Sequence, residues 1–457
     1  MCGIFGAVSN KDVAREIRHG LWDLQHRGEQ GSGMALSNGQ DHWIHKGRGL
    51  VTEVFPDEVI EGAKGYSGIG YDRYSTVGDI TEKEMSVNIQ PFIGEFHGES
   101  FAVAHNGNLI DLEPLQREAE NGGYSFKTTS DTEVIVGLLS VSQKNDFIEA
   151  LLEILPKLKG AFSLVILYKD KVIGVLDRFG IRPLCLGRND SSYILASESC
   201  AFHTIQGRLL DDIQPGEMIV LDKNGINDQL GPRPFIWAED PQLKFCIFEL
   251  VYFARPESII HGKSVYSYRV KAGEILAKEH PIDADIVIGV PASGEIYDIG
   301  FSQESEIPLE RGIGRNRYFT TKTFLTRRGT DRAALQRIKF HPLKSVVHGK
   351  RLVVTEDSVI RSKVAPEIVA MLREEGATEV HLRVGSSPIC YTCYLGIDMA
   401  SRGELIAASL PVEGVRKYIQ ADTLGYLSQE GMIKASGFKK ENLAMGCFTG
   451  VYPVELN

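Results

Sequence analysis

Residues 1–8 of the chain, MCGIFGAV, place a cysteine after the initiator methionine and before a short run of apolar and small residues. A methionine that precedes so small a residue is normally removed, and Cys2 would then carry the free α-amine of the chain. That amine titrates near 8, so it can accept the thiol proton and act as a general base beside the nucleophile. Considered alone, Cys2 fits the start of a buried first strand better than a nucleophile, and the other motifs reverse this preference.

Short apolar or alternating runs bounded by Gly, Asn and Asp continue from this stretch to about residue 221, which predicts antiparallel sheet. Residues 161–168 and 171–177 are separated by Lys169 and Asp170 and predict a β-hairpin. Helices are expected over residues 13–25 and 131–139, the second opened by Ser130 and Glu133 at the spacing of a capping box. The first half is therefore predicted to be α+β.

From about residue 243 the pattern changes to strand, loop and helix. DADIVIGV at 283–290 and KRLVVTED at 350–357 predict buried strands, and PEIVAMLREEG at 366–376 predicts a helix before the strand TEVHLRV. Repetition of this unit indicates an α/β, doubly wound parallel sheet. Residues 224–242 are rich in Gly, Pro and Asp and form the expected linker, so we expect domains over residues 2–230 and 245–457.

The composition is that of a globular protein and argues against several classes of partner. The 457 residues carry 50 basic and 60 acidic side chains, a net charge of −10, and 43% of them are hydrophobic, which is typical of a globular protein. The acidic balance, without a basic block, argues against binding to nucleic acid or a membrane surface. No apolar run reaches the roughly 18 residues of a membrane span, and no secretory signal is evident. Seven scattered cysteines suggest a cytoplasmic protein.

Polar residues follow several of the predicted strands of the first half. Asn106 and Gly107 can offer a side-chain amide and a backbone N–H to an oxyanion. Arg73 can clamp an α-carboxylate, and Asp131 can accept from an α-ammonium group. Each residue alone also fits a turn or a surface ion pair, but together with Cys2 they favour an amide hydrolase. The motifs are HRGEQGSG at 26–33, YDRYST at 71–76, AHNGNL at 104–109 and TTSDTE at 128–133.

These motifs resemble the class II glutamine amidotransferase domain. GAFS at 160–163, FGIRPL at 179–184 and ASES at 196–199 narrow the resemblance to the amidophosphoribosyltransferase family. It extends nearly end to end, through ELVYFARPES at 249–258, RNRYFTTKTF at 315–324, PLKSVVHGKRLVV at 342–354 and CFTGVYPVE at 447–455. The resemblance implies an N-terminal nucleophile αββα sandwich followed by a type I phosphoribosyltransferase domain, which binds phosphoribosyl pyrophosphate (PRPP) with Mg²⁺.

The resemblance also implies roles in the glutaminase site. Cys2 would be the nucleophile, and Asn106 and Gly107 would form the oxyanion hole. The implied glutamine-binding residues are Arg27, Arg73, Thr76 and Asp131. The family motif G-H-x-R-Y-S-T reads GYDRYST here, with Tyr71 in place of histidine. We expect this change to alter packing and to leave glutaminase activity intact.

The phosphoribosyltransferase motifs depart further from the family. The family string D-D-S-I-V-R-G-T-T becomes EDSVIRSKV at 356–364, so Ser362 replaces the glycine and Lys363 and Val364 replace both threonines. The string P-D-S-G becomes PASG, so Ala292 replaces an aspartate. The implied Mg²⁺ ligands are Glu356 and Asp357. The implied PRPP-binding residues are Ser293, Gly294, Glu356, Asp357, Ser358, Arg361, Ser362 and Lys363. A basic segment beside these loops favours an anion site and equally fits a solvated face; it contains Arg315, Arg317, Lys322, Arg327, Arg328, Arg332, Arg337 and Lys339.

The cysteines raise the question of an iron–sulfur cluster, because part of the family holds one with four cysteines. Cys246, Cys393 and Cys447 fall on three of those positions, and Ala444 occupies the fourth. The site is therefore interpreted as a remnant, with buried structural cysteines as the preferred explanation and Cys390 as a substitute ligand if a cluster is present.

Three hypotheses follow for the function. The first is an amidophosphoribosyltransferase that makes 5-phosphoribosylamine from glutamine and PRPP at the first step of purine synthesis. The second is a glutamine-hydrolysing paralogue whose second domain is inactive towards PRPP or uses another acceptor. The third is a non-catalytic regulatory or assembly protein. The resemblance implies a homo-oligomer of two or four chains.

Overall fold

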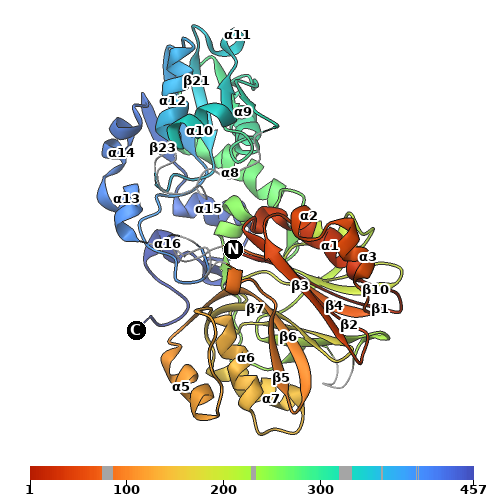
Figure 1. Ribbon diagram of the computed structural model, residues 1–457. Helices are drawn as coiled ribbons and strands as arrows, with labels where there is room; N and C mark the ends of the chain where they lie inside the picture. The colour runs from red at the N-terminus through yellow and green to blue at the C-terminus, as the bar shows by residue number, and fades with distance from the viewer. Residues whose placement is uncertain are drawn as a thin grey trace.

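A computed structural model describes residues 1–74, 86–227, 233–318, 332–361, 364–397, 399 and 401–456. Thr76, Ser362 and Lys363, which the sequence assigns to substrate binding, lie outside the described residues, as do Lys322, Arg327 and Arg328 of the basic segment. Figure 1 shows the first half of the chain, coloured red to yellow-green, beside the second half, coloured green to blue.

Two antiparallel seven-stranded sheets form the first half, as predicted. In order, the first contains β11 (Arg208–Asp212), β9 (Cys185–Arg188), β10 (Ser192–Ala196), β1 (Gly3–Ser9), β4 (Ser67–Asp72), β2 (Gly31–Ser37) and β3 (His42–Arg48). The second contains β13 (Gly225–Ile226), β12 (Glu217–Asp222), β8 (Lys171–Leu176), β7 (Lys159–Tyr168), β6 (Glu99–Ile110) and β5 (Phe92–Phe96), with β14 (Phe235–Ile236) paired to β12.

The two sheets stack face to face with helices outside them. Strand side chains alternate between faces, so Ile4 of β1 packs between the sheets with Ile69 and Val165, whereas Phe5 points outward. Phe5 packs there against Ile17 of α1 (Ala14–Asp23). Three helices cover the other sheet: α5 (Glu113–Asn121), α6 (Thr132–Val141) and α7 (Phe147–Ile154). This is the predicted αββα sandwich.

Most local predictions are confirmed. Strands β7 and β8 form the hairpin, with Lys169 at a positive φ of 53° in its turn. The capping box is wrong: the N-cap of α6 is Asp131, whose carboxylate accepts from Thr132 N. The Glu133 carboxylate instead accepts from the backbone N–H groups of Lys127 and Thr128, because the preceding turn brings those donors within reach.

The second half contains a parallel four-stranded sheet in the order β18 (Ile286–Gly289), β21 (Arg351–Glu356), β22 (Glu379–Val384) and β23 (Thr423–Tyr426). One face, including Val287 and Val353, belongs to the core that contains α8 (Val265–Glu279) and α9 (Tyr297–Ser305). The opposite face, including Ile288 and Val354, packs with α12 (Ala365–Glu374) and α14 (Val412–Ile419). Helices on both faces confirm the doubly wound class.

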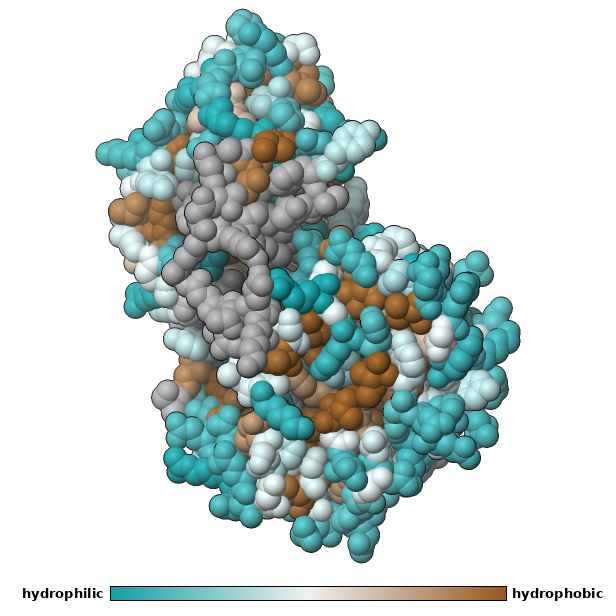
Figure 2. Space-filling view, viewed as in Figure 1, coloured by the Kyte–Doolittle hydropathy of each residue, from teal (hydrophilic) through white to brown (hydrophobic). Residues whose placement is uncertain are grey.

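The two halves share a hydrophobic core, since Ala161 and Ile181 cluster with Phe245 and Phe248. Residues 225–226 and 235–236 of the expected linker pair with β12, and the boundaries at 230 and 245 stay predictions. In the described part of the chain, no helix combines the length and apolar character needed to cross a membrane. Figure 2 shows a mainly hydrophilic face with scattered hydrophobic residues over the first half.

The remaining elements are short segments that connect these layers. They are η1 (Gln25–Arg27), α2 (Val51–Val54), α3 (Asp57–Gly62), η2 (Leu155–Lys157), η3 (Ser199–Phe202), β15 (Phe245–Cys246), η5 (Glu249–Phe253), β16 (Ile259–Ile260), β17 (Lys263–Ser264), β19 (Ile313–Arg315), α10 (Arg332–Lys339), β20 (Phe340–Pro342), α11 (Lys344–Val347), η7 (Arg402–Glu404), α13 (Ile406–Ser409), α15 (Gln429–Ser436), η8 (Lys440–Asn442), β24 (Leu443–Ala444) and α16 (Gly446–Thr449).

Candidate active sites

Cys2 lies immediately before β1 and is almost fully buried between the two sheets of the sandwich. Its Sγ lies 3.0 Å from the Tyr71 hydroxyl and donates to the Tyr74 carbonyl at 3.6 Å. Its backbone nitrogen donates to Asn106 Oδ1 at 3.2 Å. The thiol and the backbone nitrogen of Cys2 are therefore both fixed in orientation.

The predicted oxyanion hole lies beside Cys2 on β6. Asn106 is fully buried, and its Nδ2 has no hydrogen-bond partner among the described residues. A buried amide donor without a partner costs free energy, so a function for it is expected. Gly107 lies so close to β7 that a Cβ atom would come 1.9 Å from the carbonyl of Ala161, which only glycine avoids.

Replacing Asn106 with alanine tests this donor. We expect kcat for glutamine hydrolysis to fall about 10²- to 10³-fold, because the developing oxyanion loses a pre-oriented hydrogen bond. Steady-state glutamate release measures the effect. Asn108→Ala is the matched control on the same strand, since its Nδ2 donates to the carbonyls of Leu109 and Tyr394. Equal losses of kcat in the two variants would show that Asn106 does not form the oxyanion hole.

Arg73 and Asp131 lie close to the same position. Both act on the pKa of Tyr71, whose hydroxyl contacts Cys2. Arg73 is largely buried, and its Nε has no hydrogen-bond partner within the described ranges. Asp131 Oδ2 accepts from Leu109 N at 2.8 Å, which turns that carboxylate oxygen towards β6. Among the described residues, the Arg73 guanidinium thus keeps one unpaired nitrogen, while its Nη1 donates to the Asn88 carbonyl, and both it and the Asp131 carboxylate act on the tyrosine that contacts the thiol.

Arg27 contacts the backbone of the nucleophile and belongs to a buried network of ion pairs. Its Nε donates to the Cys2 carbonyl at 3.0 Å, and its other nitrogens bond to Glu198 and Glu249. Burial opposes the charge of Arg27, but the carboxylates of Glu249 and Glu198 overcome it and raise the pKa of this guanidinium. Glu249 also pairs with the buried Arg182 at 3.4 Å. The motifs that contain Glu198 and Glu249, ASES at 196–199 and ELVYFARPES at 249–258, carry no local signal of this network.

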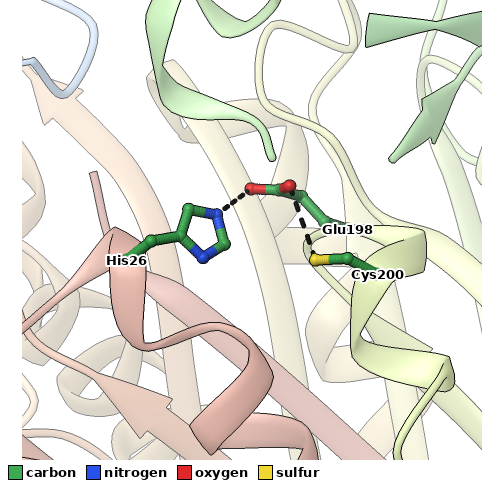
Figure 3. A group of neighbouring side chains, drawn as sticks. All are labelled: His26, Glu198 and Cys200. Atoms are coloured by element: carbon green, nitrogen blue, oxygen red, sulfur yellow. Dashed lines mark hydrogen bonds and ion pairs between the residues drawn. The ribbon is translucent and has the colours of Figure 1, made fainter. Parts of the chain in front are cut away.

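His26, Glu198 and Cys200 form a cluster with metal-ligand chemistry (Figure 3). Their potential ligand atoms lie within 4.8 Å of one another. Both oxygens of the Glu198 carboxylate already accept hydrogen bonds from the protein. Oε1 accepts from His26 Nε2 at 2.7 Å and from Arg27. Oε2 accepts from Arg255 N, Ser258 Oγ and Cys200 Sγ. The cluster is therefore a hydrogen-bonded junction between the two halves of the chain.

One cavity of about 550 Å³ is lined by residues of both halves of the chain. Its wall includes Tyr74, whose carbonyl contacts the Cys2 thiol. It also includes the acidic pair at the carboxyl end of β21, Glu356 and Asp357. The lining also contains Ala292, Ser293, Ser358, Arg361 and Val364 from the loops that the sequence assigns to PRPP.

Glu356 and Asp357 are buried together at the carboxyl end of β21. Ser293 Oγ donates to Glu356 Oε1 at 2.6 Å and ties the two predicted PRPP loops to each other. Burial raises the pKa of both carboxyl groups, and the neighbouring Asp357 raises that of Glu356 further. A hard divalent cation prefers such oxygen ligands and would offset the cost of burying them, so the pair fits Mg²⁺.

Only some of the other described residues predicted to bind PRPP, or to form the basic segment beside it, line the cavity. Gly294 is buried beneath the loop, where a Cβ would come 2.1 Å from the Thr355 carbonyl, so its role is close packing. Arg315 and Lys339 of the basic segment line the cavity. Arg337 instead pairs with Glu374 at 2.7 Å and belongs to the outer surface.

The cysteine positions do not fit a cluster held by four thiolates. Cys246 pairs in register with Ala444 between β15 and β24, so a methyl group stands at the fourth position. Burial raises the pKa of Cys246 and of Cys447, which disfavours free thiolates. The thiol of Cys390 donates to the Ala407 carbonyl at 3.4 Å. These contacts support the interpretation as structural cysteines.

Comparison with known proteins gives matches over the whole chain. A family model described as a glutamine amidotransferase domain matches residues 79–204. The amidophosphoribosyltransferase of Methanocaldococcus jannaschii is 43% identical over 100% of this chain and 98% of that protein. The Bacillus subtilis amidophosphoribosyltransferase is 38% identical over 100% of this chain and 94% of that protein.

A solved structure, the glutamine PRPP amidotransferase from B. subtilis complexed with ADP and GMP, superimposes with a TM-score of 0.90. It is 37% identical, and the match covers 99% of this chain and 98% of that chain. The fold and the site therefore define an N-terminal nucleophile glutamine amidotransferase joined to a phosphoribosyltransferase fold. The chain belongs to the amidophosphoribosyltransferase family.

Proposed function

We propose that the chain hydrolyses glutamine at Cys2 and transfers the ammonia to PRPP, giving glutamate, pyrophosphate and 5-phosphoribosylamine, the first intermediate of purine synthesis. The observation that carries this proposal is one cavity whose wall includes both Tyr74 and the Glu356–Asp357 pair. Because the Tyr74 carbonyl contacts the Cys2 thiol, this cavity offers ammonia a route from the neighbourhood of the nucleophile to the acidic strand end.

In the first half, the Cys2 α-amine takes the thiol proton, and the thiolate attacks the side-chain amide carbon of glutamine. The oxygen of that amide becomes negatively charged and accepts from Asn106 Nδ2 and from the Gly107 N–H. The amine then protonates the leaving ammonia, and water hydrolyses the γ-glutamyl thioester. Arg73 binds the α-carboxylate and Asp131 the α-ammonium group. The family motif adds Thr76 as a further glutamine contact.

In the second half, Glu356 and Asp357 would hold Mg²⁺, which would supply charge neutralisation for the pyrophosphate group. Ser293, Ser358 and Arg361 offer hydroxyl and guanidinium donors to the phosphate and ribose oxygens from the cavity wall. The ammonia nitrogen attacks the anomeric carbon as the bond to pyrophosphate breaks. The family pattern adds Ser362 and Lys363 to the phosphate contacts and Gly294 to the loop.

A glutamine-hydrolysing paralogue is the second candidate function, and two cavity residues favour it. Ala292 removes a carboxylate, and Val364 at the N-terminus of α12 cannot donate a hydrogen bond. Calorimetry with PRPP and Mg²⁺ tests the choice. Saturable binding below millimolar PRPP supports the transferase, and its absence at millimolar PRPP supports the paralogue.

The double change Ala292→Asp and Val364→Thr is expected to raise the affinity for PRPP about tenfold or more, because it restores a carboxylate and a hydroxyl donor to the cavity wall. The same titration measures the effect. Ser345→Thr and Tyr394→Phe, at positions outside the cavity lining, serve as controls. Unchanged affinity in the double variant would show that these two positions do not limit PRPP binding.

A non-catalytic protein is disfavoured, because no structural contact uses Asn106 Nδ2 in the described residues. We further propose a cytoplasmic location, which the free cysteines support. A homo-oligomer of two or four chains, acting on small-molecule substrates, is proposed from the family resemblance alone.

A further inference from the structure

Tyr71 occupies a position at which the family motif carries histidine, and the sequence predicted only a packing change there. The structure places its hydroxyl 3.0 Å from Cys2 Sγ, inside the site. Tyr71 is almost fully buried in the layer between the two sheets, 2% exposed. A buried tyrosine hydroxyl needs a polar partner, and Cys2 Sγ is the partner that the structure records.

The backbone fixes the Tyr71 ring in place. Tyr71 belongs to β4, which lies between β1 and β2, and it is in register with Ile4 on one side and Gly33 on the other. Strand β4 is therefore paired along both edges at this residue. Because Ile4 follows Cys2 by only two residues, the same pairing sets the distance between the hydroxyl and the thiol.

The Cys2 sulfur is the donor in one of its two hydrogen bonds and the acceptor in the other. The thiol has one proton, and the geometry allows it to donate this proton to the Tyr74 carbonyl at 3.6 Å. The sulfur then accepts from the Tyr71 hydroxyl. When the thiol proton moves to the α-amine, the Tyr74 contact is lost, whereas the Tyr71 hydroxyl still donates and now faces a negative charge. A hydrogen bond to a charged acceptor is stronger than one to a neutral acceptor.

We propose that the Tyr71 hydroxyl is a catalytic hydrogen-bond donor that stabilises the Cys2 thiolate and holds it towards Asn106. The inference rests on the proposed glutaminase function and adds a residue to it. No proton leaves the tyrosine oxygen at any step. Burial and the neighbouring Cys2 raise the pKa of Tyr71, so its hydroxyl keeps its proton throughout the working pH range. The other charged groups that face it are Arg73, which lowers that pKa, and Asp131, which raises it.

Tyr71→Phe is the direct test, because it removes the hydroxyl and keeps the ring. Alkylation of Cys2 by iodoacetamide, followed between pH 5 and 10 by mass spectrometry of the N-terminal peptide, reports the thiolate without requiring turnover. We expect the apparent pKa for alkylation to rise by about one unit, and kcat for glutamine to fall about 10- to 100-fold with little change in KM. Tyr168→Phe is the control, since Tyr168 stacks on Phe147 in the core beneath α7.

Tyr71→His gives a second readout that does not depend on the first variant folding. An imidazole that reaches the sulfur is expected to restore most of kcat and to add an ionisation between about pH 6 and 7 to the alkylation profile. An alkylation profile that is the same in wild type, Tyr71→Phe and Tyr71→His would overturn the inference. A shifted profile in a protein without glutaminase activity would uphold it and would count against the proposed function instead.

Discussion

Cys2→Ala is expected to abolish glutamine-dependent turnover, with a loss of at least about 10³-fold, while ammonia-dependent synthesis of phosphoribosylamine is retained. Alanine supplies no nucleophile for the thioester, and no second thiol lies in the described site to replace it. Free ammonia does not need the first site, because the proposed reaction with PRPP takes place beside Glu356 and Asp357 in the cavity wall. The two rates therefore separate the two halves of the reaction.

Glutamate release and pyrophosphate release, each measured with glutamine or with ammonium chloride, provide the readout. Cys390→Ala is the matched control, since the Cys390 thiol donates to the Ala407 carbonyl and lies outside the cavity lining. Glutamate release by Cys2→Ala at the wild-type rate would exclude Cys2 as the nucleophile. Loss of both rates together would show that the variant damages the fold, and Cys2→Ser then distinguishes the nucleophile from its packing.

Glu249→Gln is expected to lower the free energy of unfolding by about 3–5 kcal/mol. Glu249 is fully buried and accepts from two guanidinium groups that are also fully buried, Arg27 at 3.0 Å and Arg182 at 3.4 Å. Glutamine keeps one acceptor oxygen but removes the negative charge, so one buried cation loses its compensation. An uncompensated buried charge lowers the free energy of unfolding by more than the remaining hydrogen bonds contribute.

The same change is expected to slow glutamine hydrolysis, because Arg27 also holds the Cys2 carbonyl. Urea denaturation measures the stability, and glutamate release measures the activity. Glu113→Gln removes the carboxylate of an exposed pair with Arg117 and is expected to cost less than about 1 kcal/mol. A Glu249→Gln protein as stable as Glu113→Gln would contradict the view that this network holds the two halves together.

Features of the fold that depend on neighbouring residues could be predicted from the sequence. Apolar runs on either side of Lys169 and Asp170 define a hairpin because two residues suffice to turn antiparallel strands. The helix α12 and the strands beside it follow from apolar periodicity alone. The predicted N-cap of α6 is wrong by one residue, because Ser130 and Asp131 are both good N-cap residues. The Glu133 carboxylate accepts from backbone N–H groups of the preceding turn, and the sequence spacing does not specify that turn.

Features of the site that join distant segments could not be predicted from spacing. Arg27 meets Glu198 and Glu249 across 171 and 222 residues of chain, so nothing near Arg27 in the sequence identifies these partners. The contact between Tyr71 and Cys2 depends on the register between β1 and β4, which sequence patterns leave open. Residue type and position already suggested an amide hydrolase, because a thiol, an amide, a guanidinium and a carboxylate lie at predicted strand ends. The family motifs then implied the role of each, at Cys2, Asn106, Arg73 and Asp131.

The central claim is that one chain couples glutamine hydrolysis to the use of PRPP. The most direct measurement incubates the protein with glutamine, PRPP and Mg²⁺ and follows glutamate and pyrophosphate in the same sample. We expect the two products to appear in equal amounts, and pyrophosphate release to stop when either glutamine or PRPP is omitted. Glutamate release at an unchanged rate without PRPP, with no pyrophosphate formed in its presence, would contradict the account.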